Sequence, residues 1–191
     1  MSVPRLVVLT DRHQLPVDVE LVDHLARCAE AGLTHVLVRE LDLADADRER
    51  LAERLRSEGL TLWSAHRAVP GVAGVHLPDP DGSYPVRGRT EGLAWGRSCH
   101  RPDQVGAAAR AGASWATLSP VAPSLSKPGR RPLDWSALAG HEIPVLALGG
   151  VEVANARALR AAGAHGVAVM GAVMRAVDPG AVVGRLVEEC R

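Results

Sequence analysis

The sequence contains few aromatic residues and no phenylalanine: four tryptophans and one tyrosine stand among its 191 residues. Leucine, valine and alanine must therefore fill the interior, which suits buried parallel strands. No apolar run reaches the ~18 residues of a membrane-spanning helix. Hydrophobic residues nevertheless make up 47% of the chain, enough for one sizeable core. We therefore expect a single domain over residues 1–191 that does not enter a membrane.

The chain also lacks an excess of charge, because 22 acidic residues balance 22 basic ones. Without a basic tract, neither nucleic acid nor an anionic membrane is an expected partner. The three cysteines, Cys28, Cys99 and Cys190, form no C-x-x-C pair and no disulfide framework. The first residues, MSVPRLVVLTDR, show no apolar segment of a signal peptide. We expect a cytoplasmic protein. The sequence is compatible with both a monomer and a homo-oligomer.

One sequence motif, typical of the end of a helix followed by a strand, occurs three times. It reads AEAGLTHVLV at 29–38, ARAGASWATL at 109–118 and RAAGAHGVAV at 160–169. The glycines Gly32, Gly112 and Gly163 can adopt the left-handed conformation that ends a helix. Each is followed by a run typical of a buried strand. Their spacings of 80 and 51 residues accommodate four and two strand–helix units, so the motifs should lead into strands two, six and eight.

The remaining elements follow from apolar periodicity. The other predicted strands are Leu6–Thr10, Leu60–Ser64, Gly74–Leu77, Gly92–Gly96 and Pro144–Leu148. The charged stretch Asp45–Glu58 is predicted to be a solvated helix whose charges have no function. Only residues 67–72 separate strands three and four, which leaves little room for a third helix. The segment 78–90, rich in Pro, Gly and Asp, is expected to be a loop.

Alternating strands and helices indicate either a closed barrel or an open doubly wound sheet. No G-x-G-x-x-G motif follows the first strand, so a dinucleotide-binding sheet has no support. Small-residue turns after the last two strands favour the barrel, because barrels commonly bind phosphate there. The predicted fold class is α/β, a single (β/α)₈ TIM barrel with short loops and a reduced third helix.

Two of these turns predict a phosphate-binding site, here named the phosphate cup: Gly149 and Gly150 after strand seven, and Met170 and Gly171 after strand eight. Glycine lets the backbone approach an anion closely, and N–H groups at the start of a helix bind it. The alternative is that the glycines only shape tight turns. If neither has a positive φ, a valine at Gly150 or Gly171 should weaken phosphate binding without unfolding the chain.

A long loop, 119–133, follows strand six and is rich in hydroxyls and cations. Ser124, Ser126 and Lys127 are predicted to bind substrate oxygens, and Arg130 and Arg131 add positive charge. A charged loop at this face of a barrel is either solvated or a lid over the site.

Three more residues stand at predicted strand ends. His100, after strand five, is the predicted catalytic residue, because an imidazole exchanges protons near neutral pH. Arg39 and Glu40 end strand two and are assigned to substrate binding, either as a clamp or as a buried ion pair that holds the rim.

These motifs resemble the thiamine phosphate synthase and TenI superfamily nearly from end to end. The similar segments are LTDR at 9–12, VRE at 38–40, GVHLP at 74–78, GRSCH at 96–100, SPVAPSLSKPGRRPL at 119–133, LALGGV at 146–151 and GVAVMGAV at 166–173. Two activities share that fold. The synthase couples hydroxymethylpyrimidine diphosphate to a thiazole phosphate with Mg²⁺, and the TenI branch isomerises a thiazole carboxylate phosphate without metal.

The departures from the synthase pattern favour the TenI branch. Leu37 and Leu41 stand where the synthase has a glutamine and a diphosphate-binding lysine. Ala65 and His66 replace its asparagine and metal-binding aspartate. Asp81 can match its second metal aspartate, but one carboxylate anchors Mg²⁺ poorly. The histidine of the TenI strand-five motif matches His100.

The resemblance thus implies a TenI-like thiazole tautomerase, with a small phosphorylated thiazole as ligand and no cofactor or metal. His100 would shuttle the proton, and Ser126 and Lys127 would close the strand-six side of the phosphate cup. A divergent thiamine phosphate synthase is the alternative within the family. A non-catalytic barrel that binds a phosphorylated ligand and regulates a partner is the alternative of another class.

Overall fold

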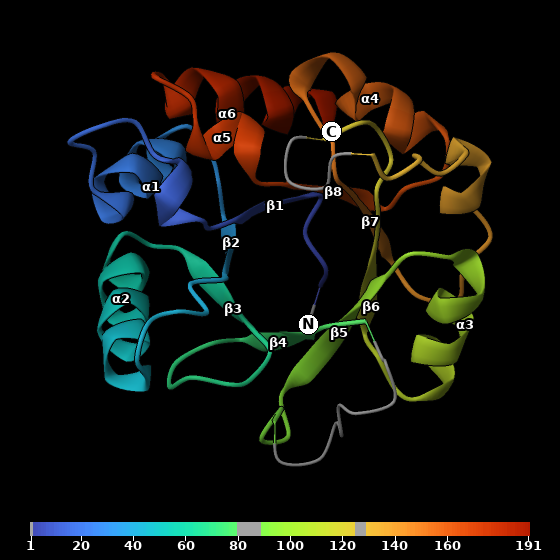
Figure 1. The fold of residues 1–191 in the computed structure, drawn as a ribbon, viewed down its shortest axis with the longest axis horizontal. Coiled ribbons are helices and arrows are strands. Elements are labelled where there is room, and N and C mark those ends of the chain that lie inside the picture. Colours follow the sequence, from blue (N-terminus) through green and yellow to red (C-terminus); the bar gives the residue numbers. More distant parts are fainter. Residues whose placement is uncertain (1, 80–88, 125–128) are drawn as a thin grey trace.

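The computed structural model describes residues 2–79, 89–124 and 129–191, which form a closed barrel of eight parallel strands (Figure 1). Each strand pairs with the next one in sequence, and β8 returns to β1 through Leu6 opposite Val167. The strands are β1 Leu6–Leu9, β2 His35–Val38, β3 Thr61–Ala65, β4 Gly74–Leu77, β5 Ala94–Cys99, β6 Trp115–Leu118, β7 Val145–Leu148 and β8 Gly166–Val169. The predicted TIM-barrel fold is confirmed.

Helices pack around the outside of the strands (Figure 1). They are α1 Leu21–Glu30, α2 Asp45–Ser57, α3 Pro102–Arg110, α4 Val153–Ala161, α5 Gly171–Met174 and α6 Pro179–Glu189, with 3₁₀ turns η1 Arg12–Gln14 and η2 Trp135–Leu138. The fully described connection between β3 and β4 contains no helix, so the reduced third helix is confirmed. None of the described helices is long and apolar enough to cross a membrane.

The three repeated motifs lie where the sequence predicts. Gly32, Gly112 and Gly163 have φ values of 97°, 90° and 110° and follow the ends of α1, α3 and α4. This left-handed conformation is readily adopted by glycine, and it stops the helix before β2, β6 and β8 begin. The prediction of strands two, six and eight is therefore correct.

The boundaries of β5 differ from the prediction. The strand was expected over Gly92–Gly96, but it covers Ala94–Cys99. Gly92 lies in a turn with φ 78°, and Ser98 and Cys99 pair with β6. The apolar pattern alone did not reveal this pairing, because Arg97 and Ser98 are polar. As a result, His100 is the first residue beyond the strand, at the mouth of the barrel.

Two tryptophans fill the inside of the barrel. Trp63 and Trp115 stack with their ring centroids 4.1 Å apart, among buried Leu37, Leu146 and other inward residues. A Cβ on Gly96 would lie 2.6 Å from Trp115 Cδ1, so only glycine fits beside that ring. The barrel interior is therefore a packed core, and the free space lies at the carboxyl ends of the strands.

Arg48 corrects the prediction that the charges of α2 have no function. Its side chain is fully buried beneath the barrel rim, and its Nη2 donates a hydrogen bond of 3.0 Å to the carbonyl oxygen of Ala65, the last residue of β3. A charge predicted to have no role thus supports the end of a strand. The apolar pattern missed it because only the fold shows which face of α2 turns inward.

Candidate active site

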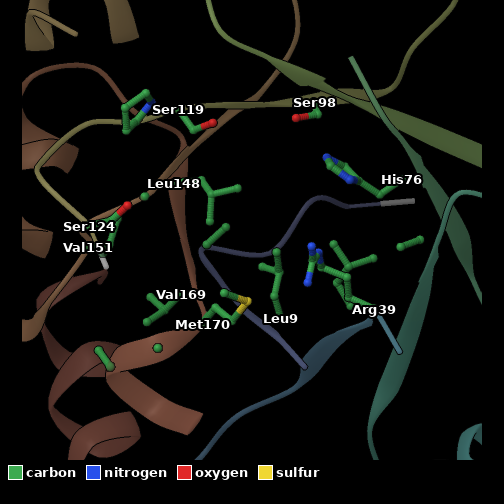
Figure 2. Close-up of a pocket in the computed structure, with 18 of the residues that line it drawn as sticks. Leu9, Arg39, His76, Ser98, Ser119, Ser124, Leu148, Val151, Val169 and Met170 are labelled. Atoms are coloured by element: carbon green, nitrogen blue, oxygen red, sulfur yellow. The ribbon is translucent and has the colours of Figure 1, made fainter. Parts of the chain in front are cut away.

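A cavity of about 560 Å³ opens at the carboxyl ends of the strands (Figure 2). Its lining includes His66 after β3, His100 after β5, Gly150 after β7 and Met170 after β8. Leu37 and Leu148 belong both to this lining and to the inner core, so the packed core supports the cavity. The cavity therefore lies where active sites of TIM barrels are found.

The four residues of the predicted phosphate cup all line this one cavity. Gly149 and Gly150 have φ values of 85° and 74°, and a Cβ on Gly150 would lie 2.6 Å from the carbonyl oxygens of Ala122 and Pro123. Gly150 is thus needed for the close contact between the loops after β6 and β7. The sequence analysis expected the fold to tolerate valine at position 150 only if φ of Gly150 is not positive. Because φ of Gly150 is positive, valine there should also destabilise the fold.

The loop after β6 is only partly within the described residues. Ser124 lines the cavity, whereas Ser126 and Lys127 lie outside the described residues. Arg130 and Arg131 are exposed and are not among the described residues of the lining. Of the predicted substrate-binding residues in this loop, the structure therefore places Ser124 at the cavity.

His100 lines the cavity with a defined ring orientation. Its Nδ1 lies 2.9 Å from the carbonyl oxygen of Ser119, and because a carbonyl only accepts, Nδ1 is the donor. Its Nε2 lies 3.8 Å from Asp79 Oδ2. Gln104 connects Asp79 and His100 through hydrogen bonds. Its side-chain Nε2 donates to Asp79 Oδ1, and its Oε1 accepts from the backbone N–H of His100. With the proton of the neutral ring on Nδ1, Nε2 is the nitrogen that accepts a second one.

Arg39 and Glu40, both assigned to substrate binding from the sequence, lie in different places: Arg39 is in the described lining and Glu40 is not. Arg39 is exposed and lines the cavity, and Figure 2 shows it with His76 across the cavity from Ser124 and Val151. Glu40 is buried, lies outside the described lining and accepts hydrogen bonds from the backbone N–H and the Nη1 of Arg12, at 3.0 and 2.8 Å. Glu40 therefore holds the rim through Arg12 and not through Arg39.

Two further histidines line the cavity: His66, which the sequence comparison placed where the synthase has an aspartate, and His76, which was not singled out from the sequence. His66 has a left-handed backbone with φ 71°, and burial, together with the positive charges of Arg39 and nearby arginines, lowers its pKa. His76 lies inside β4, with its Nε2 3.0 Å from Thr117 Oγ1. Burial, chiefly, lowers the pKa of His76 to about 3. The alternation of β4 places His76 on the inner face, a signal that sequence reasoning could have used.

We expect His76 to destabilise the fold in acid. Between its folded pKa of about 3 and its unfolded value of ~6.5, the unfolded chain binds one more proton at this residue, so stability rises with pH. As the pH drops from 6 to 4, the free energy of unfolding should fall more steeply in wild type than in His76→Gln. The difference between the two slopes should be ~1.4 kcal/mol per pH unit. Urea unfolding at several pH values checks this. Equal slopes for the two proteins would contradict it.

The described residues of the cavity do not form a ligand set suited to the Mg²⁺ of the synthase reaction. Among the described residues no group of three or more His, Cys, Asp or Glu side chains could hold a metal ion. Ala65 and His66 occupy the end of β3, and Asp79 and Glu152 are the carboxylates of the described lining. Mg²⁺ prefers several hard oxygen ligands in near-octahedral geometry, which these residues do not offer. Asp81 lies outside the described residues.

Comparison with known proteins identifies the family. The family model described as thiamine monophosphate synthase matches residues 65–173. The chain is 30% identical to the thiamine-phosphate synthase of Geobacillus kaustophilus, over 88% of this chain and 85% of that protein, and 37% identical to that of Salinispora tropica, over 80% and 82%. The solved thiamine phosphate pyrophosphorylase from Pyrococcus furiosus shares the fold, with TM-score 0.81, 24% identity and coverage of 97% and 95% of the two chains.

The protein is thus a TIM barrel with its cavity at the carboxyl ends of the strands. More particularly, the chain belongs to the thiamine monophosphate synthase family. The family that the sequence motifs resemble is confirmed, but the TenI branch within it is not shown. The names of the relatives match the synthase, which is the alternative of the sequence analysis, rather than the tautomerase.

Proposed function

We propose that this chain is an enzyme of thiamine biosynthesis that binds a thiazole phosphate, with the phosphate in the cup. The observation that carries the proposal is the convergence of Gly149, Gly150, Met170 and Gly171 on one cavity, in a chain of this family. Three of the four residues are glycines, which let the backbone of two neighbouring loops approach a phosphate closely.

The opposite side of the cavity suits a second anionic group. Arg39 is exposed there, across from Val151 of the cup side (Figure 2), and no ion pair joins it to another described residue. A guanidinium matches the geometry of a carboxylate or a phosphate. A thiazole carboxylate phosphate carries one anion for the cup and one for Arg39, so its ring would lie across the cavity.

The reaction that the site geometry supports best is proton transfer on such a ring by His100. With Nδ1 held by the carbonyl of Ser119, Nε2 would accept the proton that leaves one ring position and return it at the other, so the isomer forms with no net gain or loss of protons. The step needs no metal, in agreement with the ligand set of the described residues. This is the thiazole tautomerase reaction.

The synthase is the second candidate, and the names of the relatives favour it. That reaction must stabilise a departing diphosphate, which is the role of cations and metal. The present chain has Leu41, Ala65 and His66 where the family pattern has a lysine, an asparagine and an aspartate. Proton transfer is therefore the first candidate reaction, and the synthase reaction is the second.

We expect turnover to be independent of Mg²⁺. Isomerisation of thiazole carboxylate phosphate, followed by NMR, should proceed at the same rate with EDTA and with millimolar Mg²⁺, because the proton transfer uses His100 alone. A parallel reaction supplies hydroxymethylpyrimidine diphosphate, thiazole phosphate and Mg²⁺. Formation of thiamine phosphate there would promote the synthase. Binding of the thiazole phosphate without either product would favour the non-catalytic regulatory barrel.

A further inference from the structure

Arg175 stands at the edge of the phosphate cup, although neither the motifs nor the proposed reaction assigns it a role. It directly follows α5, is exposed and lines the cavity together with Gly171, four residues earlier. Its guanidinium lies directly over the Gly171 backbone: a Cβ on Gly171 would come within 2.6 Å of Nη2 and 2.7 Å of Cζ. Any side chain at position 171 would therefore displace the guanidinium.

Two side chains from the other end of the sequence fix this position. Arg175 Nη1 donates a hydrogen bond to Gln14 Oε1. The Nε2 of Gln14 in turn donates to Asp11 Oδ2 at 2.7 Å, which turns the amide oxygen of Gln14 toward Arg175. The guanidinium is thus held at the cup by a chain of hydrogen bonds and not by an opposing carboxylate.

The charges around the cup leave Arg175 available for an anion. None of the described carboxylates forms an ion pair with it. Glu152, the carboxylate of the described lining on the cup side, precedes α4, and its backbone N–H donates a hydrogen bond of 2.9 Å to Asn155 Oδ1. Arg39, the other arginine of the described lining, belongs to the β2 side. A guanidinium has five N–H donors in a fork that matches phosphate oxygens.

We propose that Arg175 is a phosphate-binding residue of this site, and that Gly171 is glycine because the guanidinium must lie against its backbone. The inference rests on the proposed binding of a substrate phosphate in the cup. It assigns Gly171 two roles, since its N–H belongs to the cup and its missing side chain makes room for Arg175. The ligand class is a phosphate monoester.

The test is a double-mutant cycle on binding. Gly171→Ala keeps the backbone N–H and a permitted backbone conformation, because φ of Gly171 is not in the left-handed region. Its methyl group should displace only the end of Arg175. Gly171→Ala, Arg175→Ala and the double variant are titrated calorimetrically with thiazole phosphate, with its dephosphorylated alcohol and with inorganic phosphate. Arg185→Ala, on the exposed surface of α6 and outside the described lining, is the control for loss of one positive charge.

We expect Arg175→Ala to weaken binding of thiazole phosphate about 10–100-fold, as for loss of a charge-assisted hydrogen bond, and to leave binding of the alcohol unchanged. Gly171→Ala alone should weaken phosphate binding. When it is added to Arg175→Ala, it should weaken phosphate binding little further. Full affinity in Arg175→Ala, or additive losses in the double variant, would overturn the inference.

The inorganic phosphate titration separates this inference from the proposed function. If wild type binds inorganic phosphate but not the thiazole phosphate, the proposed substrate is wrong. Loss of phosphate binding in Arg175→Ala would then still support a phosphate site at Arg175. If all variants bind inorganic phosphate equally and wild type also binds the thiazole phosphate, the substrate stands and the role of Arg175 fails.

Discussion

Replacing His100 with asparagine is expected to lower kcat about 10²–10⁴-fold, the usual contribution of general acid–base catalysis. Asparagine keeps a polar side chain that can still donate to the Ser119 carbonyl, but it cannot exchange a proton near pH 7. Binding of the thiazole phosphate should change little, because the phosphate cup is built from β7 and β8 and not from β5. The measurement is kcat and ligand affinity on the same preparation, with the melting temperature as a check on folding.

His141→Asn is the matched control. The Nε2 of His141 also lies within hydrogen-bonding distance of a backbone carbonyl, that of Ala137 at 2.8 Å, but His141 is not among the described residues that line the cavity. Both variants should change stability to a similar, small extent, and only His100→Asn should lose turnover. A well-folded His100→Asn protein with nearly wild-type kcat would rule out the proton transfer as drawn here and would direct attention to another base.

The second large effect is expected at Gly150. Alanine there meets the left-handed backbone, which raises the free energy of the folded state by ~1–2 kcal/mol, and it also presses on the carbonyl oxygens of Ala122 and Pro123, which adds ~1–3 kcal/mol. Urea unfolding should therefore show a loss of ~2–5 kcal/mol in the free energy of unfolding.

Gly59→Ala separates the two contributions. Gly59 has a φ of 78°, close to that of Gly150, but no heavy atom lies within 4 Å of the position its Cβ would take. This variant should lose only the ~1–2 kcal/mol of the backbone term. Equal losses in Gly59→Ala and Gly150→Ala would contradict the close contact between the loops after β6 and β7, and with it the observed shape of the cup.

The fold was predictable because its signals are local. Gly32, Gly112 and Gly163 each end a helix and precede a strand within a few residues, and the short segment between β3 and β4 leaves no room for a helix. That the four residues of the predicted cup line one cavity was predictable for the same reason, since they stand in the turns that follow β7 and β8. These features need no knowledge of which strands close the barrel.

The remaining features depend on contacts that only barrel closure creates. Gln14 and Arg175 are 161 residues apart in sequence but share a hydrogen bond, because β8 pairs with β1. Glu40 bonds Arg12 rather than its neighbour Arg39 because β1 and β2 lie side by side. Arg48 is buried because α2 turns that side chain toward the end of β3. No pattern of residue types along the chain shows which of several arginines meets which partner.

The central claim, that a thiazole phosphate binds with its phosphate in the cup, is tested most directly by a crystal structure with thiazole carboxylate phosphate bound. We predict that the phosphate lies against the backbone at Gly150 and Gly171, within reach of Arg175, with the carboxylate directed toward Arg39. A phosphate bound at Arg39 with the cup left empty, or a ligand bound outside this cavity, would contradict the claim.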